Sequence, residues 1–194
     1  DARSHSIYIS DDPYEIAASL RSGNSYNVMG DLVNKLRCKA SIMRGSHAVK
    51  SVEMGGELVS YGPINKLRIR IHFNSPKFNN NGDIPRVDHF DLIAGDITGK
   101  IDPSSPDYTN ATNPSTQVIA TFTSDDWKVL RDGSKLITYT IEEVSKSMYF
   151  RVRGTNMAPD TEGETDTDGN PLADTEAPVI EGESDGERAN RQAW

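Results

Sequence analysis

Apolar and polar residues alternate strictly in the middle of the chain, and this pattern limits the folds available to it. Leu67, Ile69, Ile71 and Phe73 alternate with Lys66, Arg68, Arg70 and His72, and residues 35–42 show the same period of two. Period-two alternation predicts strands with one buried and one wet face, which favours antiparallel pairing. Further strands are expected at 87–94, 116–123, 135–142 and 147–153. The sequence therefore predicts a mainly β protein with an antiparallel β-sandwich.

The first 31 residues follow a different pattern. A helix is expected to begin near Asp11 or Asp12, with Pro13 in its first turn, and to end at Gly23. Short extended runs, 6–9 and 25–28, flank it. We therefore expect a strand–helix–strand lead-in over 1–31 and the sandwich over 32–158. A second helix of one or two turns is expected at 124–130.

Acidic residues are concentrated near the C-terminus. Residues 159–187 contain eleven Asp or Glu and no Lys or Arg, whereas the first 158 residues hold 19 basic and 18 acidic side chains. A stretch of this kind buries too little apolar surface to offset the entropy of ordering it. We expect residues 159–194 to form an acidic, irregular tail, either a solvated loop or a flexible arm.

The same tail carries a candidate calcium loop. Glu164, Asp166, Asp168 and Asn170 place oxygen ligands at every second position, and Ca²⁺ prefers oxygen ligands. The glycine and the final glutamate of an EF-hand are not at the required positions. An irregular calcium loop is therefore the alternative to a purely solvated tail.

A second candidate site lies around His89. Asp83 and Asp88 precede it and Asp91 follows it, and on a strand His89 and Asp91 project to the same face. These four side chains are candidates for a metal or ligand site. The alternative is that they hydrogen-bond to loop backbone and serve the fold.

Basic residues suggest a third site. Arg151 and Arg153 share a strand face that leads to Asn156. They are candidates for binding a carboxylate or phosphate group. Pairing with the neighbouring acidic tail is the other interpretation.

Composition narrows the class of protein. The single cysteine, Cys38, excludes an internal disulfide and any multi-cysteine zinc site. The formal net charge of −8 and the lack of a basic stripe argue against nucleic-acid binding. No apolar run is long enough to span a bilayer. We interpret the start at Asp1, which shows no signal-peptide pattern, as that of a fragment or processed piece, and favour a periplasmic or extracellular location.

Catalytic motifs are not apparent. The four histidines form no H-x-H or H-E-x-x-H pair, and the chain has no G-x-S-x-G elbow or glycine-rich phosphate loop. Whether the chain takes part in an enzyme is therefore left open by its residues.

Several segments resemble one enzyme family. The segment 14–31, YEIAASLRSGNSYNVMGD, resembles the pattern aLRxGxSfvvxGdl at the end of the catalytic barrel of PHP-type (polymerase and histidinol phosphatase) metal-dependent phosphoesterases, of the CehA/McbA-like metallohydrolase kind. Residues 79–95 and 149–156, with 164–166 and 169–172 downstream, are similar to the β-domain that follows the barrel in some of these proteins.

The resemblance implies a non-catalytic C-terminal β-sandwich whose partner is the catalytic barrel of the same parent protein. The divalent-metal ligands would lie upstream of Asp1, so the resemblance transfers no catalytic residue. An aromatic-rich strand would follow Trp194, and its absence would leave the isolated sandwich poorly soluble or oligomeric.

Two further functions remain open. One is a cell-surface module that binds Ca²⁺ or a carbohydrate through the loops at 79–91 and 164–170. The other is an inhibitor or assembly partner that uses its acidic arm against a basic protein.

Overall fold

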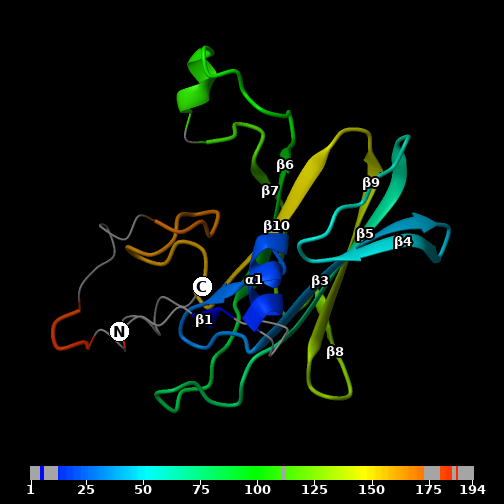
Figure 1. Ribbon diagram of the computed structural model, residues 1–194. Coiled ribbons are helices and arrows are strands. Elements are labelled where there is room, and N and C mark those ends of the chain that lie inside the picture. The colour runs from blue at the N-terminus through cyan, green and yellow to red at the C-terminus, as the bar shows by residue number, and fades with distance from the viewer. Residues whose placement is uncertain (1–4, 7–12, 111, 173–179, 185–186, 188–194) are drawn as a thin grey trace.

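The computed structural model describes residues 5–6, 13–110, 112–172, 180–184 and 187. Within these residues the protein is mainly β, with two antiparallel sheets that pack face to face as the sequence predicts (Figure 1). Helical structure is confined to short segments outside the sheets.

Eight strands form the sandwich. In order across the larger sheet they are β4 (His47–Glu53), β3 (Lys35–Arg44), β5 (Ile64–Asn74), β9 (Lys135–Val144) and β8 (Trp127–Val129). The smaller sheet has the order β10 (Met148–Thr155), β6 (His89–Asp96) and β7 (Gln117–Phe122). All neighbouring pairs are antiparallel, and burial alternates along β3 and β5 as expected.

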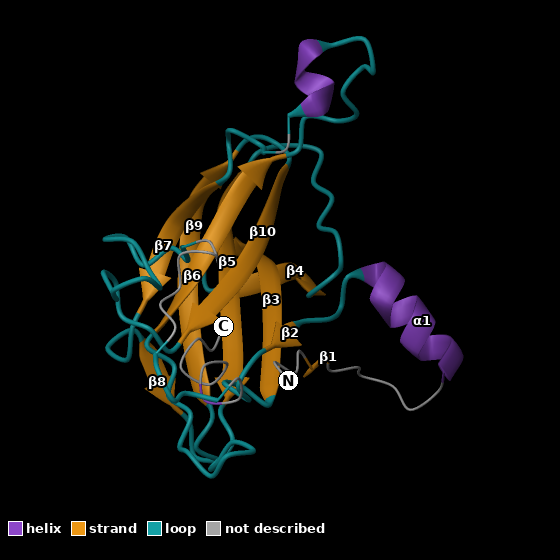
Figure 2. Ribbon diagram, turned by 90° about the vertical axis from the view of Figure 1, so that its left-hand side faces the viewer, coloured by secondary structure: helices purple, strands orange, loops and turns teal. Residues whose placement is uncertain are grey.

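The lead-in contributes a two-stranded sheet, and its Val28 packs into the hydrophobic core. The strands β1 (His5–Ser6) and β2 (Asn27–Val28) pair with each other, and α1 (Pro13–Ser22) lies between them in the chain. Figure 2 shows α1 set apart from the two sheets. The predicted strand–helix–strand order is present, although residues 7–9 of the first expected strand lie outside the described residues.

The core lies between the two sheets. Ile71, Phe73 and Leu92 are inaccessible to solvent, and the Phe73 ring packs edge-on against Phe90 at 4.6 Å and against Trp127 at 5.3 Å between ring centroids. Each such side chain contributes about 1.5–3 kcal/mol by its burial. The apolar residues of β5 are therefore buried in the core, as their alternation predicts.

Residues 124–130 do not form the expected helix. Thr123 and Asp126 close a turn, in which the Asp126 carboxylate accepts a hydrogen bond from the Thr123 N–H at 2.8 Å. The chain then enters β8, where Trp127 lies opposite Ile137 of β9. Burial of Trp127 against Phe73 outweighs the local preference for a helical turn.

Strand β4 was not expected. It is exposed along most of its length, so its residues lack the alternation that marks a half-buried strand. A two-residue turn, Gly45-Ser46 with Gly45 at φ 60°, joins it to β3. This Gly-Ser turn is the sequence signal for the hairpin.

A long connection between β6 and β7 leaves the end of the sandwich. It contains the short 3₁₀ helix η1 (Pro106–Thr109) and projects away from both sheets (Figure 2). Among the described residues, no helix combines the length and apolar character that a bilayer crossing requires.

Candidate functional site

Strand β6 has two buried faces, and they differ in chemistry. Phe90 and Leu92 point into the apolar core, whereas His89 and Asp91 point to the outer face of the smaller sheet. His89 and Asp91 are nevertheless each only 1% exposed. Something must therefore cover this outer face and satisfy its polar groups.

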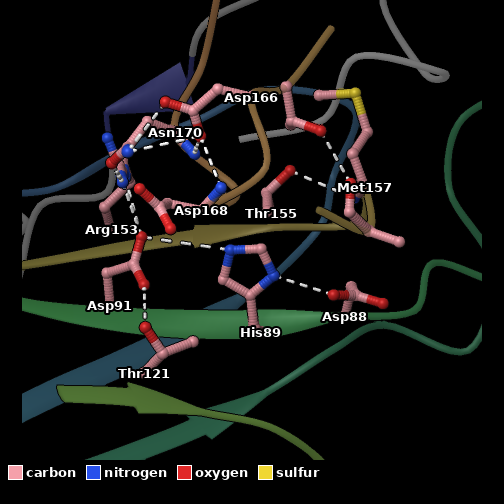
Figure 3. Close-up of polar contacts among 12 residues, drawn as sticks. Asp88, His89, Asp91, Thr121, Arg153, Thr155, Met157, Asp166, Asp168 and Asn170 are labelled. Atoms are coloured by element: carbon pink, nitrogen blue, oxygen red, sulfur yellow. Dashed lines mark hydrogen bonds and ion pairs between the residues drawn. The ribbon is translucent and has the colours of Figure 1, made fainter. Parts of the chain in front are cut away.

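The guanidinium of Arg153, on β10, donates hydrogen bonds to the buried Asp91 carboxylate. The two residues are direct cross-strand partners, and the guanidinium donates to Asp91 Oδ2 from Nη2 at 2.6 Å and from Nε at 3.1 Å. Thr121 of β7 donates to the other carboxylate oxygen at 2.8 Å. The three strands of the small sheet thus meet at one carboxylate (Figure 3).

The described part of the acidic tail provides the cover. Arg153 Nη2 also donates to Asn170 Oδ1 at 2.9 Å, which ties the tail to the sheet. Glu164 and Thr165 are buried. The loop that contains Glu164, Thr165 and Asn170 therefore lies against the sandwich.

Asp166 organises this covering loop. Its Oδ1 accepts hydrogen bonds from the backbone N–H groups of Asp168 at 2.9 Å and of Asn170 at 2.8 Å, and its Oδ2 accepts from Asn170 Nδ2 at 3.0 Å. The side-chain bond from Asn170, and then the backbone bond from the same residue, hold the pKa of the Asp166 carboxyl below its ordinary value. The loop is thus closed around an ionised carboxylate.

His89 lies beneath the loop between two carboxylates. Its Nδ1 is 2.7 Å from Asp88 Oδ1, and its Nε2 is 3.9 Å from Asp91 Oδ2, too far for a hydrogen bond. Nε2 is buried and has no hydrogen-bond partner in the described part of the chain. Gly169 packs directly on the ring, since a Cβ at that position would come within 3.1 Å of Cε1 and Nε2.

The structure places one predicted metal ligand, Asp83, apart from the other three. Asp88, His89 and Asp91 are close together, whereas Asp83 is exposed and bonds within its own turn, its N–H donating to Asn79 Oδ1 at 2.8 Å. In the described ranges no three His, Cys, Asp or Glu residues form a group suited to a metal ion.

The predicted calcium ligands also differ in environment. Glu164 is buried, Asp168 is exposed, and Asp166 and Asn170 bond to each other. Calcium binding stays a prediction, and it would require Asp166 and Asn170 to exchange these hydrogen bonds for the cation.

The two arginines have separate roles. Arg153 pairs with Asp91 and with the tail residue Asn170, which is the second of the two interpretations of the arginine pair. Arg151 is exposed on the same face of β10. Asn156 follows the end of β10 and is half-buried. The contribution of Thr121 was not expected from the sequence, because it depends on which residue of β7 lies opposite Asp91.

A large apolar groove lies on the other side of β10. Its volume is about 1280 Å³, and its walls come from β10, from the inner face of β3 and β5, and from the chain segments at 23–33 and 52–63. Half-buried apolar side chains line it, among them Leu36, Ala40, Ile64, Met148 and Phe150. Apolar surface patches of this kind are often functional.

Comparison with known proteins identifies no relative. No family model matches the chain, and the searches of curated proteins and of solved structures give no match.

Proposed function

We propose that this chain is a non-catalytic β-sandwich that packs against the catalytic domain of a metal-dependent phosphoesterase. The observation that carries the proposal is the apolar groove beside β10. A groove of this size with half-buried apolar walls suits contact with another folded unit or polypeptide segment. The resemblance to PHP-type proteins suggests which unit that is.

The polar cluster supports a structural role for the sandwich. Asp91 is held by Arg153 and Thr121, and Asp166 is held by Asn170 and by backbone amides. These groups bond to one another, so they are not arranged as a nucleophile with its base and oxyanion donors. The cluster fixes the acidic loop on the sheet.

Catalysis would reside in the parent's other domain. In phosphoesterases of this kind, His and Asp ligands at the ends of barrel strands hold divalent metals, which polarise the phosphoryl oxygen and activate water. The sandwich would brace that barrel or shape the access of substrate to it.

The test is a comparison of this chain with the longer parent protein that we propose. We expect the longer protein, loaded with Mn²⁺, Fe²⁺ or Zn²⁺, to hydrolyse bis(p-nitrophenyl) phosphate or another ester in a phosphate-ester panel, and this chain alone to be inactive. A longer protein that carries H-x-H and D-x-H motifs but leaves the whole panel intact would contradict the proposal.

A further inference from the structure

We infer that β10 accepts an added β-strand from another polypeptide segment, whose residues alternate between apolar and acidic. The inference rests on the proposed role of the chain as a docking module, and it specifies the chemistry of the docked segment.

Strand β10 lies at the edge of its sheet. It pairs with β6 along one side, and no strand pairs with its other side within the described residues. Residues from both faces of β10, Phe150 and Val152 as well as Tyr149 and Arg151, line the groove. A groove bordered by both faces of a strand runs along that strand's free edge, where backbone N–H and C=O groups are open to pairing.

The dimensions of the groove fit a strand. Strand β10 has eight residues, which span about 27 Å at roughly 3.4 Å per residue. The groove volume of about 1280 Å³ exceeds the range of about 300–1,000 Å³ usual for small-molecule sites. An extended peptide satisfies both the length of the edge and the volume beside it.

The inner side of the groove selects apolar side chains. Met148, Phe150 and Val152 pack against the core from β10, and Leu36 and Ala40 lie on the opposing sheet. A strand added to β10 would place every second side chain between these two walls. Those positions must be apolar, since a polar group buried there would lose its hydrogen bonds to water.

The outer side selects acidic side chains. Arg153 is neutralised by Asp91, and Lys146, just before β10, pairs with Asp96 at 2.6 Å. Arg151 is exposed and has no ion pair in the part of the chain that the structure describes. An Asp or Glu on the added strand opposite Arg151 would supply the missing charge, and opposite charges directly across a strand pair are favourable.

Hydrogen–deuterium exchange with designed peptides tests the inference. The probe is a capped ten-residue peptide that alternates valine and glutamate, and its control alternates valine and lysine. At a protein concentration where sedimentation shows a monomer, the glutamate peptide should slow exchange at amides of residues 148–155 at least about tenfold. It should bind about fivefold more tightly than the lysine peptide for each charge pair formed.

Charge reversal provides the matched pair of variants. Arg151→Glu should reverse the preference between the two peptides, whereas Arg131→Glu, the same change at an exposed turn outside the groove, should leave it unchanged. The unique thiol Cys38 lines the groove and gives a second readout. Bound peptide should slow its alkylation.

Three results would overturn the inference. The first is no protection of residues 148–155 by either peptide. The second is protection of Cys38 without protection of β10, which would indicate a compact apolar ligand in place of a strand. The third is protection of residues 148–155 in the absence of peptide. If this protection rises with protein concentration, a second copy of the chain occupies the groove. If it does not rise, residues of the same chain occupy the groove. A longer protein that proves not to be a phosphoesterase would refute the proposed function while leaving the peptide result intact.

Discussion

At the scale of single residues, the buried pair of Asp91 and Arg153 holds the small sheet and its covering loop together. The Asp91 side chain is 2% exposed and that of Arg153 is 21% exposed. Removing one member of a buried pair leaves the other charge without its partner, at a cost of about 3–5 kcal/mol. Because Arg153 retains some contact with water, the lower end of that range applies here.

We predict that Asp91→Ala lowers the free energy of unfolding by about 3 kcal/mol in urea denaturation. The control is Asp125→Ala at an exposed turn position, where a change within about 0.5 kcal/mol is expected. Equal effects of the two substitutions would show that the Asp91–Arg153 pair contributes nothing to stability.

Cys38 is a residue-scale probe of the groove. Its burial, and secondarily the negative charge of Glu53, raise the pKa of the thiol to about 12. In the native protein at pH 8, alkylation by iodoacetamide should be at least about 100-fold slower than in urea, because the thiolate is the reacting form. Similar rates in the two conditions would mean that the thiol is not desolvated.

The same shift links stability to alkaline pH. The folded pKa lies above the ordinary value of 9.0, so folding favours the protonated thiol. The stabilisation is complete below pH 9 and is lost as the pH rises from 9 towards 12. Cys38→Ala should remove this part of the alkaline decline, as measured by urea midpoints at several pH values.

At the scale of elements, the acidic loop is the part most sensitive to acid. The lowered pKa of Asp166 means that the folded loop favours the carboxylate. The stabilisation by the Asp166 carboxylate is therefore present above the ordinary pKa of 3.8, and it is lost as the pH falls through the lower pKa of the folded state.

We expect acid titration followed by NMR to show the amide signals of Asp168 and Asn170 leaving their native positions before those of β5. Asp166→Asn should produce this loosened loop at neutral pH and abolish the acid transition there. Simultaneous loss of the loop and β5 signals would contradict a separate role for Asp166.

A close backbone contact at Gly55 joins the lead-in to the sandwich. Gly55, at φ 82°, has the backbone of Ser22 and Asn24 in the space that a Cβ would occupy. Gly55→Ala should therefore displace the lead-in and raise hydrogen exchange at residues 22–33 while the two sheets stay folded. Gly62→Ala is the control, since Gly62 has open space around its Cβ position. Unchanged exchange in Gly55→Ala would show that the lead-in does not depend on this contact.

Strands β3 and β5 are predictable from the alternation of apolar and polar residues, a repeat that their burial follows. Strand β5 is identifiable because its apolar residues face one core, whereas the exposed β4 and the three-residue β8 lack that repeat. The position of Trp127 depends on β9, which follows it in the chain, so its local sequence favoured a helical turn instead.

The candidate site was predictable in its residue types but not in its contacts. Alternation places His89 and Asp91 on one face, and the sequence raised the pairing of Arg153 with the acidic tail as one alternative. That Arg153 meets Asp91 follows from the register of β6 against β10, which brings together residues 62 positions apart. The orientation of Asn170 depends in turn on the loop that Asp166 closes.

At the scale of the whole molecule, the sandwich has an outer face closed by its own tail, and the edge of β10 is open within the described residues. The closed face contains Asp91 and Arg153, and the open edge is that of β10 beside the apolar groove. The proposed docking function depends on the open edge of β10.

The measurement that tests this claim most directly is hydrogen–deuterium exchange at residues 148–155, compared between this chain and the proposed longer parent protein. We expect fast exchange at the amides on the open edge of β10 in this chain and protection of those amides in the longer protein. Identical exchange in the two proteins would contradict it, because it would mean that the groove beside β10 receives no neighbouring segment.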